Sequence, residues 1–318
     1  MNTQNERGEA LTESACPKNV FGARNISITH FGQPLVLHLV KDGTDQQAHR
    51  KAGLMLGEDG QQYMHGWLFG IGDHRLYPAA AVPGSSWQVL EVDTDELTCL
   101  EGGVAFKRGY VLHTGDMVSA ARYLEEHVPG IRNAPVIGAC RHTGKQQSVR
   151  VGAYGHAVAG DSGRARAGDY GTAIAGIGGN AAAGESGFAV AGDRGAAKAG
   201  DFGSAHVGEF GTARVGHGGT AIAADSGTAR AGDVGRATAG DYGTAQVGAK
   251  GVAWAGRNGM AAAGAKGEIR LSYWDTQAER VRTVIGYIGE NGLLPNTLYK
   301  LDESHQFTPA DTSPGELQ

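Results

Sequence analysis

An eight-residue pattern of apolar and polar positions runs through the second half of the chain. Glycine recurs at every eighth position from Gly155 to Gly267, and the unit approximates x-A-x-A-G-D-x-G, as in Arg164–Gly171. The second position is alanine in every unit from Ala157 to Ala261, and the fourth is alanine or valine. Two small apolar residues separated by one variable residue are typical of a half-buried strand. The pattern therefore predicts one short strand and one corner per unit.

A helix is the competing interpretation, because alanine is the best helix former. Two glycines per unit would cost a helix about 1 kcal/mol each, and a period of eight fits neither 3.6 nor 3.5 residues per turn. The G-D-x-G segment instead suits a turn, in which we expect glycine to take a positive φ. We expect each aspartate to hydrogen-bond its own backbone there, as in an Asx-turn.

The variable residue between the two alanines indicates how many strands complete one coil. In alternate units this residue is mainly basic or polar, and in the intervening units it is mainly apolar. A coil of two strands would place the two series on opposite faces, whereas a coil of three strands would mix them. The sequence therefore predicts a mainly β fold, in which octapeptide repeats form a β-solenoid with two strands per 16-residue coil.

The segments on either side of the repeats are expected to cover the open strand edges at the ends of the solenoid. We predict four regions: a disordered tail over 1–20, a small α+β domain over 21–147, the solenoid over 148–267, and a C-terminal β cap and tail over 268–318.

Elements within these flanking regions follow from local patterns. An amphipathic stretch over 117–128 predicts a helix with Asp116 as its N-cap. After the repeats, Ile269 and Leu271 take the inward places of alanines, so the core should thicken at that end, and a tail should begin near residue 308. Branched and aromatic runs predict strands at 25–28, 35–40, 87–92, 281–288 and 297–301.

Composition and charge exclude several classes of protein. The chain has 318 residues and a net charge of −5, so it lacks the overall basic field expected of a nucleic-acid binder. It contains no run of about 18 apolar residues, so we expect neither a membrane span nor a signal peptide. Cys16, Cys99 and Cys140 are widely spaced without a CxxC pair, which argues against disulfides and structural zinc. These features predict a cytoplasmic protein.

The repeat resembles sequences of known bacterial proteins. Ala167–Gly176 resembles the tandem repeats of ice-nucleation proteins. The chain also resembles octapeptide-repeat bacterial proteins of unassigned function that end in Tyr-Trp-Asp and Gly-Tyr-Ile-Gly segments, here Tyr273–Asp275 and Gly286–Gly289. The first resemblance covers the repeat region and implies a solenoid, with ice binding or nucleation as an alternative function. That function needs a regular Thr-x-Thr array, and outward pairs such as Arg164/Arg166 interrupt it.

Motifs that suggest catalysis or metal binding have simpler explanations. Gly160–Gly163 matches the nucleophile segment of trypsin-like proteases, but Ala224–Gly227 nearly repeats it in register. Stacked aspartates are a candidate calcium site, yet calcium rolls use nine-residue units. Cys140 and His142 are a candidate nucleophile or metal pair, although among twelve histidines a chance neighbour is expected. We predict no catalytic residue, no metal site and no cofactor.

Two outward surfaces remain as candidate binding sites. The first, which we call the basic face, carries cations with no acidic residue among the outward strand positions, and arginine suits bidentate recognition of carboxylate or phosphate. The second, the apolar strip, should be covered by the N-terminal domain, a second copy of the chain or a partner. The basic face comprises Arg150, Arg164, Arg166, Lys198, Arg214 and Arg230, and the apolar strip comprises Val158, Ile174, Phe188, Val190, Ile222, Val252 and Trp254.

These surfaces favour a non-enzymatic protein that presents a rigid solenoid to another protein, such as an inhibitor or an immunity-type protein. The apolar strip predicts a homodimer as the simplest way to bury one such patch per chain. Ice binding or nucleation, and an enzyme with an unrecognised site in 21–147, are the alternatives. Neither a membrane nor a nucleic acid is expected as a partner.

Overall fold

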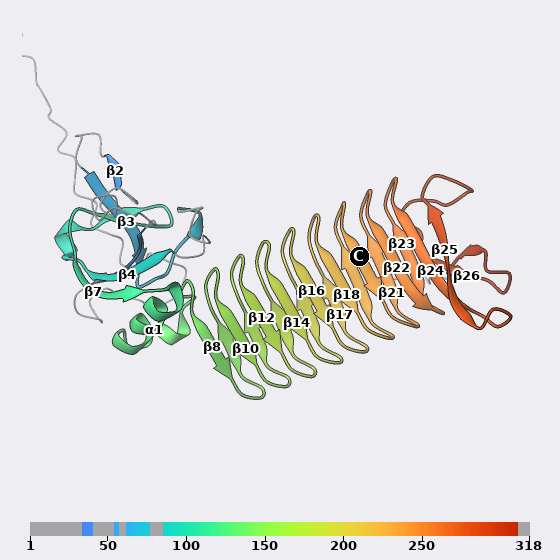
Figure 1. The fold of residues 1–318 in the computed structure, drawn as a ribbon, viewed down its shortest axis with the longest axis horizontal. Coiled ribbons are helices and arrows are strands. Elements are labelled where there is room, and N and C mark those ends of the chain that lie inside the picture. Colours follow the sequence, from blue (N-terminus) through green and yellow to red (C-terminus); the bar gives the residue numbers. More distant parts are fainter. Residues whose placement is uncertain (1–33, 41–53, 57–61, 77–84, 311–318) are drawn as a thin grey trace, which may run out of the picture. The chain divides into compact units, whose positions relative to one another are not determined.

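The computed structural model describes residues 34–40, 54–56, 62–76 and 85–310. The chain divides into two compact units, residues 1–129 and 130–318, and each is described by itself. The fold is mainly β, as the sequence predicts (Figure 1). The strand expected at 25–28 and the tail expected over 1–20 lie outside the described residues.

The first unit contains a seven-stranded antiparallel sheet in the order β5-β6-β3-β1-β4-β7, with β2 paired to β3. Its core includes Trp67 and Trp87, which are fully buried and stack with ring centroids 5.8 Å apart. The predicted strand 35–40 is β1, and 87–92 is β4 with bounds one residue earlier. The strands are β1 (Leu35–Val40), β2 (Leu54–Leu56), β3 (Gln62–Leu68), β4 (Ser86–Glu91), β5 (Thr98–Leu100), β6 (Gly103–Phe106) and β7 (Tyr110–Gly115).

The predicted helix is α1, Met117–His127. Its N-cap is Asp116, whose carboxylate accepts a hydrogen bond from the Ser119 amide at 2.7 Å. This bond lowers the pKa of Asp116. Helix α1 buries Ala120, Ala121 and Leu124 and packs against β4 and β7. Three short 3₁₀ turns complete the described helical segments: η3 (His74–Leu76), η5 (Thr94–Glu96) and η6 (Ile131–Asn133).

One expectation for this unit is wrong. The cysteine spacing argued against a disulfide framework, but Cys99 in β5 is disulfide-bonded. Cys140 is a free, exposed thiol. Sequence spacing alone does not reveal such a bond, because the distance and direction of two cysteines in the fold decide whether they can be bridged.

The second unit is a β-solenoid of flattened coils with two strands per coil, which confirms the predicted architecture (Figure 1). Successive strands alternate between two ten-stranded sheets, and each repeat strand up to β22 pairs in parallel with the strand 16 residues further on, as Val158 does with Ile174. The stack extends beyond 148–267, because β8 pairs with β10 at one end and β24 with β22 at the other.

We call the sheet that begins with β8 sheet I and the sheet that begins with β9 sheet II. Sheet I contains β8 (Cys140–Thr143), β10 (His156–Ala159), β12 (Thr172–Ala175), β14 (Phe188–Ala191), β16 (Ser204–Val207), β18 (Thr220–Ala223), β20 (Arg236–Ala239), β22 (Val252–Arg257), β24 (Glu268–Asp275) and β25 (Arg280–Tyr287). Sheet II contains β9 (Ser148–Arg150), β11 (Arg164–Arg166), β13 (Asn180–Ala182), β15 (Ala196–Lys198), β17 (Thr212–Arg214), β19 (Thr228–Ala231), β21 (Thr244–Val247), β23 (Met260–Ala263), β26 (Tyr299–Leu301) and β27 (Phe307–Pro309).

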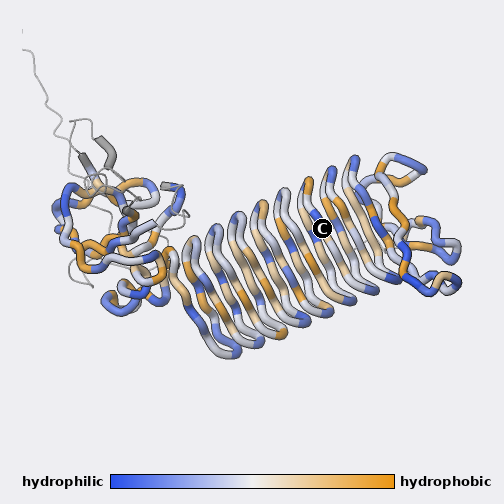
Figure 2. The backbone as a smooth tube through the Cα atoms, in the orientation of Figure 1, coloured by the Kyte–Doolittle hydropathy of each residue, from blue (hydrophilic) through white to orange (hydrophobic). Residues whose placement is uncertain are grey.

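The solenoid core consists mainly of alanine and valine methyl groups. Most of the alanines predicted to point inward are buried, for example Ala157 and Ala205 in sheet I and Ala165 in sheet II. Ala167, Ala183 and Ala231, at the ends of sheet II strands, are half-buried. Figure 2 shows the resulting pale to apolar strands, with polar residues at many of the corners. Ile269 and Leu271 are also fully buried, so larger side chains do fill the C-terminal end.

The corners differ from the prediction in their backbone geometry. The positive φ belongs to the residue after the aspartate position, as in Ser162 and Val234, whereas the flanking glycines of the repeat keep ordinary φ values. Those glycines are needed for another reason. A Cβ on Gly163 would lie 2.7 Å from the Gly160 carbonyl oxygen and 2.9 Å from that of Gln147 in the coil before. Close approach of stacked backbones therefore excludes a side chain.

A buried arginine closes the N-terminal end of the coil stack. Arg141 of β8 occupies the inward position opposite Ala157 and is almost fully buried. Its guanidinium donates hydrogen bonds to the carbonyl oxygens of Arg132, Ala134 and Arg150 at 2.7, 2.6 and 2.6 Å. In the next coil the equivalent carbonyl, that of Arg166, accepts from the Val151 amide, but β9 has no strand before it to donate to Arg150. The Arg141 side chain supplies that missing donor.

The C-terminal end is closed by strands that reverse direction. In sheet I, β25 pairs antiparallel with β24, and in sheet II a hairpin of β26 and β27 follows β23. The predicted strands 281–288 and 297–301 correspond to β25 and β26. The prediction that a tail begins near residue 308 is wrong, because β27 includes residues 307–309. Residues 311–318 lie outside the described part. Pro309 in the last strand cannot donate to a further strand.

The thin core makes a specific stability prediction. Ala205 has no exposed surface and lies between Ala189 and Ala221 in register, so Ala205→Leu should overpack the core and lower the unfolding free energy by about 1–3 kcal/mol. Ala196→Leu, at an exposed outward position of β15, is the matched control and should change it by less than about 0.5 kcal/mol. Equal denaturation midpoints for the two variants would contradict an inward-facing Ala205.

Candidate functional site

The predicted basic face lies entirely on sheet II. Arg166 pairs in register with Arg150, and Lys198, Arg214 and Arg230 follow one another on three consecutive strands. Ala182 separates these two groups, so five cations share one row along the coil axis, with Arg164 beside the row. Since paired strands lie about 4.8 Å apart, the row extends for about 24 Å.

The charges of this row are not compensated within the described chain. Among residues 85–310, none of the six basic side chains forms an ion pair, and no outward position of β9 to β23 in sheet II is acidic. Five of the six are exposed, whereas Arg230 is half-buried and its Nε has no hydrogen-bond partner in this part of the chain. Like charges directly opposite on neighbouring strands destabilise a sheet. The row therefore has a cost that an anionic ligand would remove.

The predicted apolar strip lies on the opposite sheet. Val158, Ile174 and Val190 follow one another in register on sheet I, and the row continues through His206, Ile222 and Thr238 to Trp254. His206 packs against Phe188 with ring centroids 5.1 Å apart, and burial lowers its pKa, which favours the neutral imidazole. Phe188 and Trp254 are each 39% exposed, and the other strip residues are half-buried.

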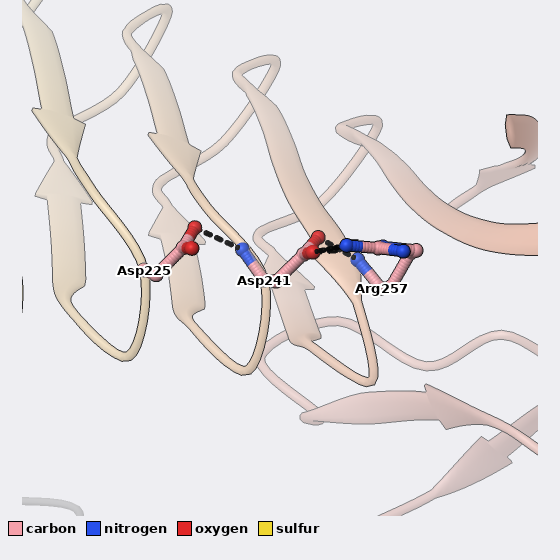
Figure 3. Close-up of polar contacts among 3 residues, drawn as sticks. All are labelled: Asp225, Asp241 and Arg257. Carbon is pink, nitrogen blue, oxygen red and sulfur yellow. Dashed lines mark hydrogen bonds and ion pairs between the residues drawn. The ribbon is translucent and has the colours of Figure 1, made fainter.

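The acidic corners link one coil to the next, which corrects the expected Asx-turn. Asp225 Oδ1 accepts a hydrogen bond at 2.8 Å from the amide of Asp241, 16 residues further on, and Asp241 does the same for Arg257 at 2.7 Å (Figure 3). In return, the amide of Ser226 donates to the Asp241 carbonyl at 2.8 Å. Two opposed hydrogen bonds thus join neighbouring corners. The same side-chain bond is made by Asp161, Asp169, Asp193, Asp201 and Asp233.

Cations are placed at both ends of one corner row. Lys145 Nζ lies 3.0 Å from Asp161 Oδ2 at the first coil, and this hydrogen bond lowers the pKa of Asp161. At the last coil, the Nε of Arg257 donates to Asp241 Oδ2 at 2.7 Å. This contact lowers the pKa of Asp241 and raises that of Arg257. Ion pairs thus close the row at each end (Figure 3 shows the second).

The remaining sequence candidates do not assemble into a catalytic or metal site. Cys140 Sγ lies 3.8 Å from His142 Nε2 on the exposed face of β8, and no third ligand from the described residues joins them. No group of three or more His, Cys, Asp or Glu side chains suited to a metal occurs in the part of the chain that the structure describes. Ser162 of the protease-like segment lies at an exposed corner in the left-handed conformation.

Sequence reasoning missed a pocket of about 620 Å³ at the C-terminal end of the solenoid. Its walls come from two successive corners, from β24 and from the β26–β27 hairpin, and include Arg257, Tyr273, Trp274, Lys300 and His305. In the sequence, Tyr273 and Trp274 stood out only as part of the Tyr-Trp-Asp segment that resembles the C-terminal segment of octapeptide-repeat proteins. Their convergence with a hairpin some 30 residues later has no local pattern that would have revealed it.

No family model, curated protein or solved structure matches the chain. The likeness to ice-nucleation repeats therefore rests on the repeat motif alone. Among the described residues, no helix is long and apolar enough to cross a membrane.

Proposed function

We propose that the solenoid is a non-enzymatic binding rod whose basic face docks on an acidic surface of another protein. The row of five cations on sheet II, stacked in register with no acidic residue at an outward position of the repeat strands, is the observation that supports this most directly. Arginine predominates in the row, and its planar fork recognises carboxylates in a bidentate manner. An inhibitor or an immunity-type protein would use such a surface against an acidic target.

The shape of the basic face favours a protein partner over a nucleic acid. The strands of sheet II in the repeat are three or four residues long, so the face is only about 10–14 Å wide. Acidic corners flank it on both edges, for example Asp193 and Asp225 on one and Asp201 and Asp233 on the other. A nucleic-acid duplex is wider than this face, since its major groove alone is about 12 Å across, and its phosphates would approach those carboxylates. A narrow acidic element aligned with the row avoids them.

The alternatives gain less support. Outward pairs such as Arg164/Arg166 and Ala196/Lys198 break the regular threonine array that ice binding requires. An enzyme in 21–147 would need a cluster of catalytic groups, and the described part of that range offers none that we can assign. We do not include a cytoplasmic location in the proposal. Cys99 is disulfide-bonded, and disulfides persist mainly in oxidising compartments.

A binding measurement with a defined acidic probe tests the basic face. Fluorescence anisotropy with a labelled poly-L-glutamate of about 20 residues should show binding that weakens as salt is raised, because exposed charges are screened. Arg166→Glu together with Arg214→Glu should weaken binding about tenfold or more. Arg236→Glu, an equally exposed arginine on sheet I, should have little effect beyond the change in net charge.

Two outcomes would contradict the proposal. The first is a labelled single-stranded DNA of similar length that binds more tightly than poly-L-glutamate and is released by the same double substitution, which would assign the face to a nucleic acid. The second is equal weakening by Arg236→Glu, which would reduce the effect to overall charge.

The apolar strip supports a second role, which is self-association through sheet I. The strip is about 30 Å long, and pairing with its own copy would bury at most roughly 800 Å² per protomer, which is within the range of stable interfaces. A two-fold dimer buries one such patch on each protomer with a single kind of contact. The half-exposed rings of Phe188 and Trp254 are the residues that gain most from such burial.

Light scattering tests the dimer. Ile174→Asp together with Ile222→Asp should convert a dimer into a folded monomer, because two carboxylates would be desolvated at the contact. Thr212→Asp together with Thr244→Asp, at outward positions of sheet II, is the control and should leave the dimer intact. A wild-type chain that is monomeric at micromolar concentration would contradict the dimer. Unfolding of the isoleucine variant would instead show that the strip is intramolecular core.

A further inference from the structure

The pocket at the C-terminal end of the solenoid is built by an irregularity in the last complete coil. A β-bulge between Ala255 and Arg257 shifts the register of β22 against β24, so that Arg257 pairs with Ser272. The bulge coincides with the corner at Arg257, where the β26–β27 hairpin also contributes to the pocket. A cavity of about 620 Å³ is within the size range of small-molecule sites. Its lining residues belong neither to the basic face nor to the apolar strip, although Trp254 at the end of the strip donates a hydrogen bond at 3.1 Å to Ser272 in the pocket wall.

Some aromatic rings that line the pocket are stacked on another ring, and others are not. Tyr273 and His305 stack with ring centroids 3.7 Å apart and an interplanar angle of 22°, which fixes the position of both rings. Trp274 and Tyr242 lack such a ring partner among the described residues, and 48% of Trp274 is exposed. A large ring left half in water at the wall of a hollow is an apolar platform with a polar N–H at its edge.

The charged groups of the pocket balance one another. Asp241 accepts from Arg257 (Figure 3), and Asp302 Oδ1 accepts the amides of Ser304 and Gln306 at 2.9 Å each. With Lys300, the pocket carries two carboxylates and two cations. It therefore presents donors and acceptors together without a net charge that would select a phosphate, a nucleotide or a metal ion.

We propose that this pocket binds a neutral saccharide. A sugar ring has one face of C–H groups and a rim of hydroxyls that both donate and accept hydrogen bonds, and the pocket offers the matching combination. Trp274 would supply the stacking surface, while Arg257, Asn258 and Asp302 would meet the hydroxyls. The stacked pair of Tyr273 and His305 holds the wall behind them. This site is independent of the proposed protein partner, because it rests on different residues.

Isothermal titration calorimetry of the full chain with a panel of neutral oligosaccharides tests the proposal. The panel comprises tetraoses of β-linked glucose, α-linked glucose, N-acetylglucosamine, mannose and galactose. We expect at least one to bind with a dissociation constant below about 1 mM. Trp274→Ala should weaken that binding at least about tenfold. Tyr170→Ala is the matched control, since Tyr170 is an equally exposed aromatic residue at a distant corner, and it should leave binding unchanged.

Several results would overturn the proposal. Absence of heat for every member of the panel at about 10 mM would exclude a saccharide site of useful affinity. Binding that survives Trp274→Ala in a chain with unchanged thermal midpoint would place the sugar elsewhere. Tighter binding of an acidic probe, a tetramer of galacturonate, than of every neutral sugar would show that the pocket selects charge. A second variant, Asp302→Asn, separates these cases, because it should weaken neutral sugars and strengthen an acidic one.

Discussion

Adjacent coils of the solenoid stack at the spacing of hydrogen-bonded parallel strands, about 4.8 Å, and the corners must follow the same spacing. At each corner the repeat glycine lies against the carbonyl of the coil before, so no Cβ fits there. The aspartate side chain then accepts the amide of the next corner, and a backbone amide donates in the opposite direction. Neighbouring corners are therefore joined as tightly as neighbouring strands. This constraint explains why glycine and aspartate recur every eight residues in most repeats.

Tight stacking determines what else the chain needs. Alanine and valine fill the core because the coil leaves space for nothing larger in its interior, as the buried Ala157 and Ala205 show. Burial of such small groups contributes little per residue, at about 0.8 kcal/mol per methylene equivalent, so backbone hydrogen bonds and the ends matter more. Arg141 supplies donors where the stack begins, and antiparallel strands with Pro309 close it where it ends. The outward strand positions take no part in this core, so their side chains can vary and can serve in binding.

The sequence predicts the regular part of this fold and misses the parts that depend on contacts between coils. Alternation of small and variable residues is a local signal, so the strands, the two sheets and the segregation of the basic face from the apolar strip follow from it. The conformation of Val234 and the reach of Asp225 to the next coil do not, because a single repeat does not show what stacks on it. In the sequence, nothing distinguishes Arg141 from the other basic residues. The pocket around Trp274 depends on a bulge and on a hairpin distant in sequence.

The central claim is that the narrow space between coils requires the repeat glycine, whereas the positive-φ position before it does not require glycine, since Val234 occupies it in one repeat and Gly218 in another. Two adjacent substitutions test it in one denaturation experiment. A Cβ on Gly235 would lie 2.7 Å from that of Ala231 in its own coil and 3.0 Å from the Gly219 carbonyl oxygen of the coil before, so Gly235→Ala should lower the unfolding free energy by about 1–3 kcal/mol. Val234→Gly should leave it unchanged within about 1 kcal/mol, because release from φ 59° offsets the added chain entropy. A tolerated Gly235→Ala beside a destabilising Val234→Gly would contradict the account.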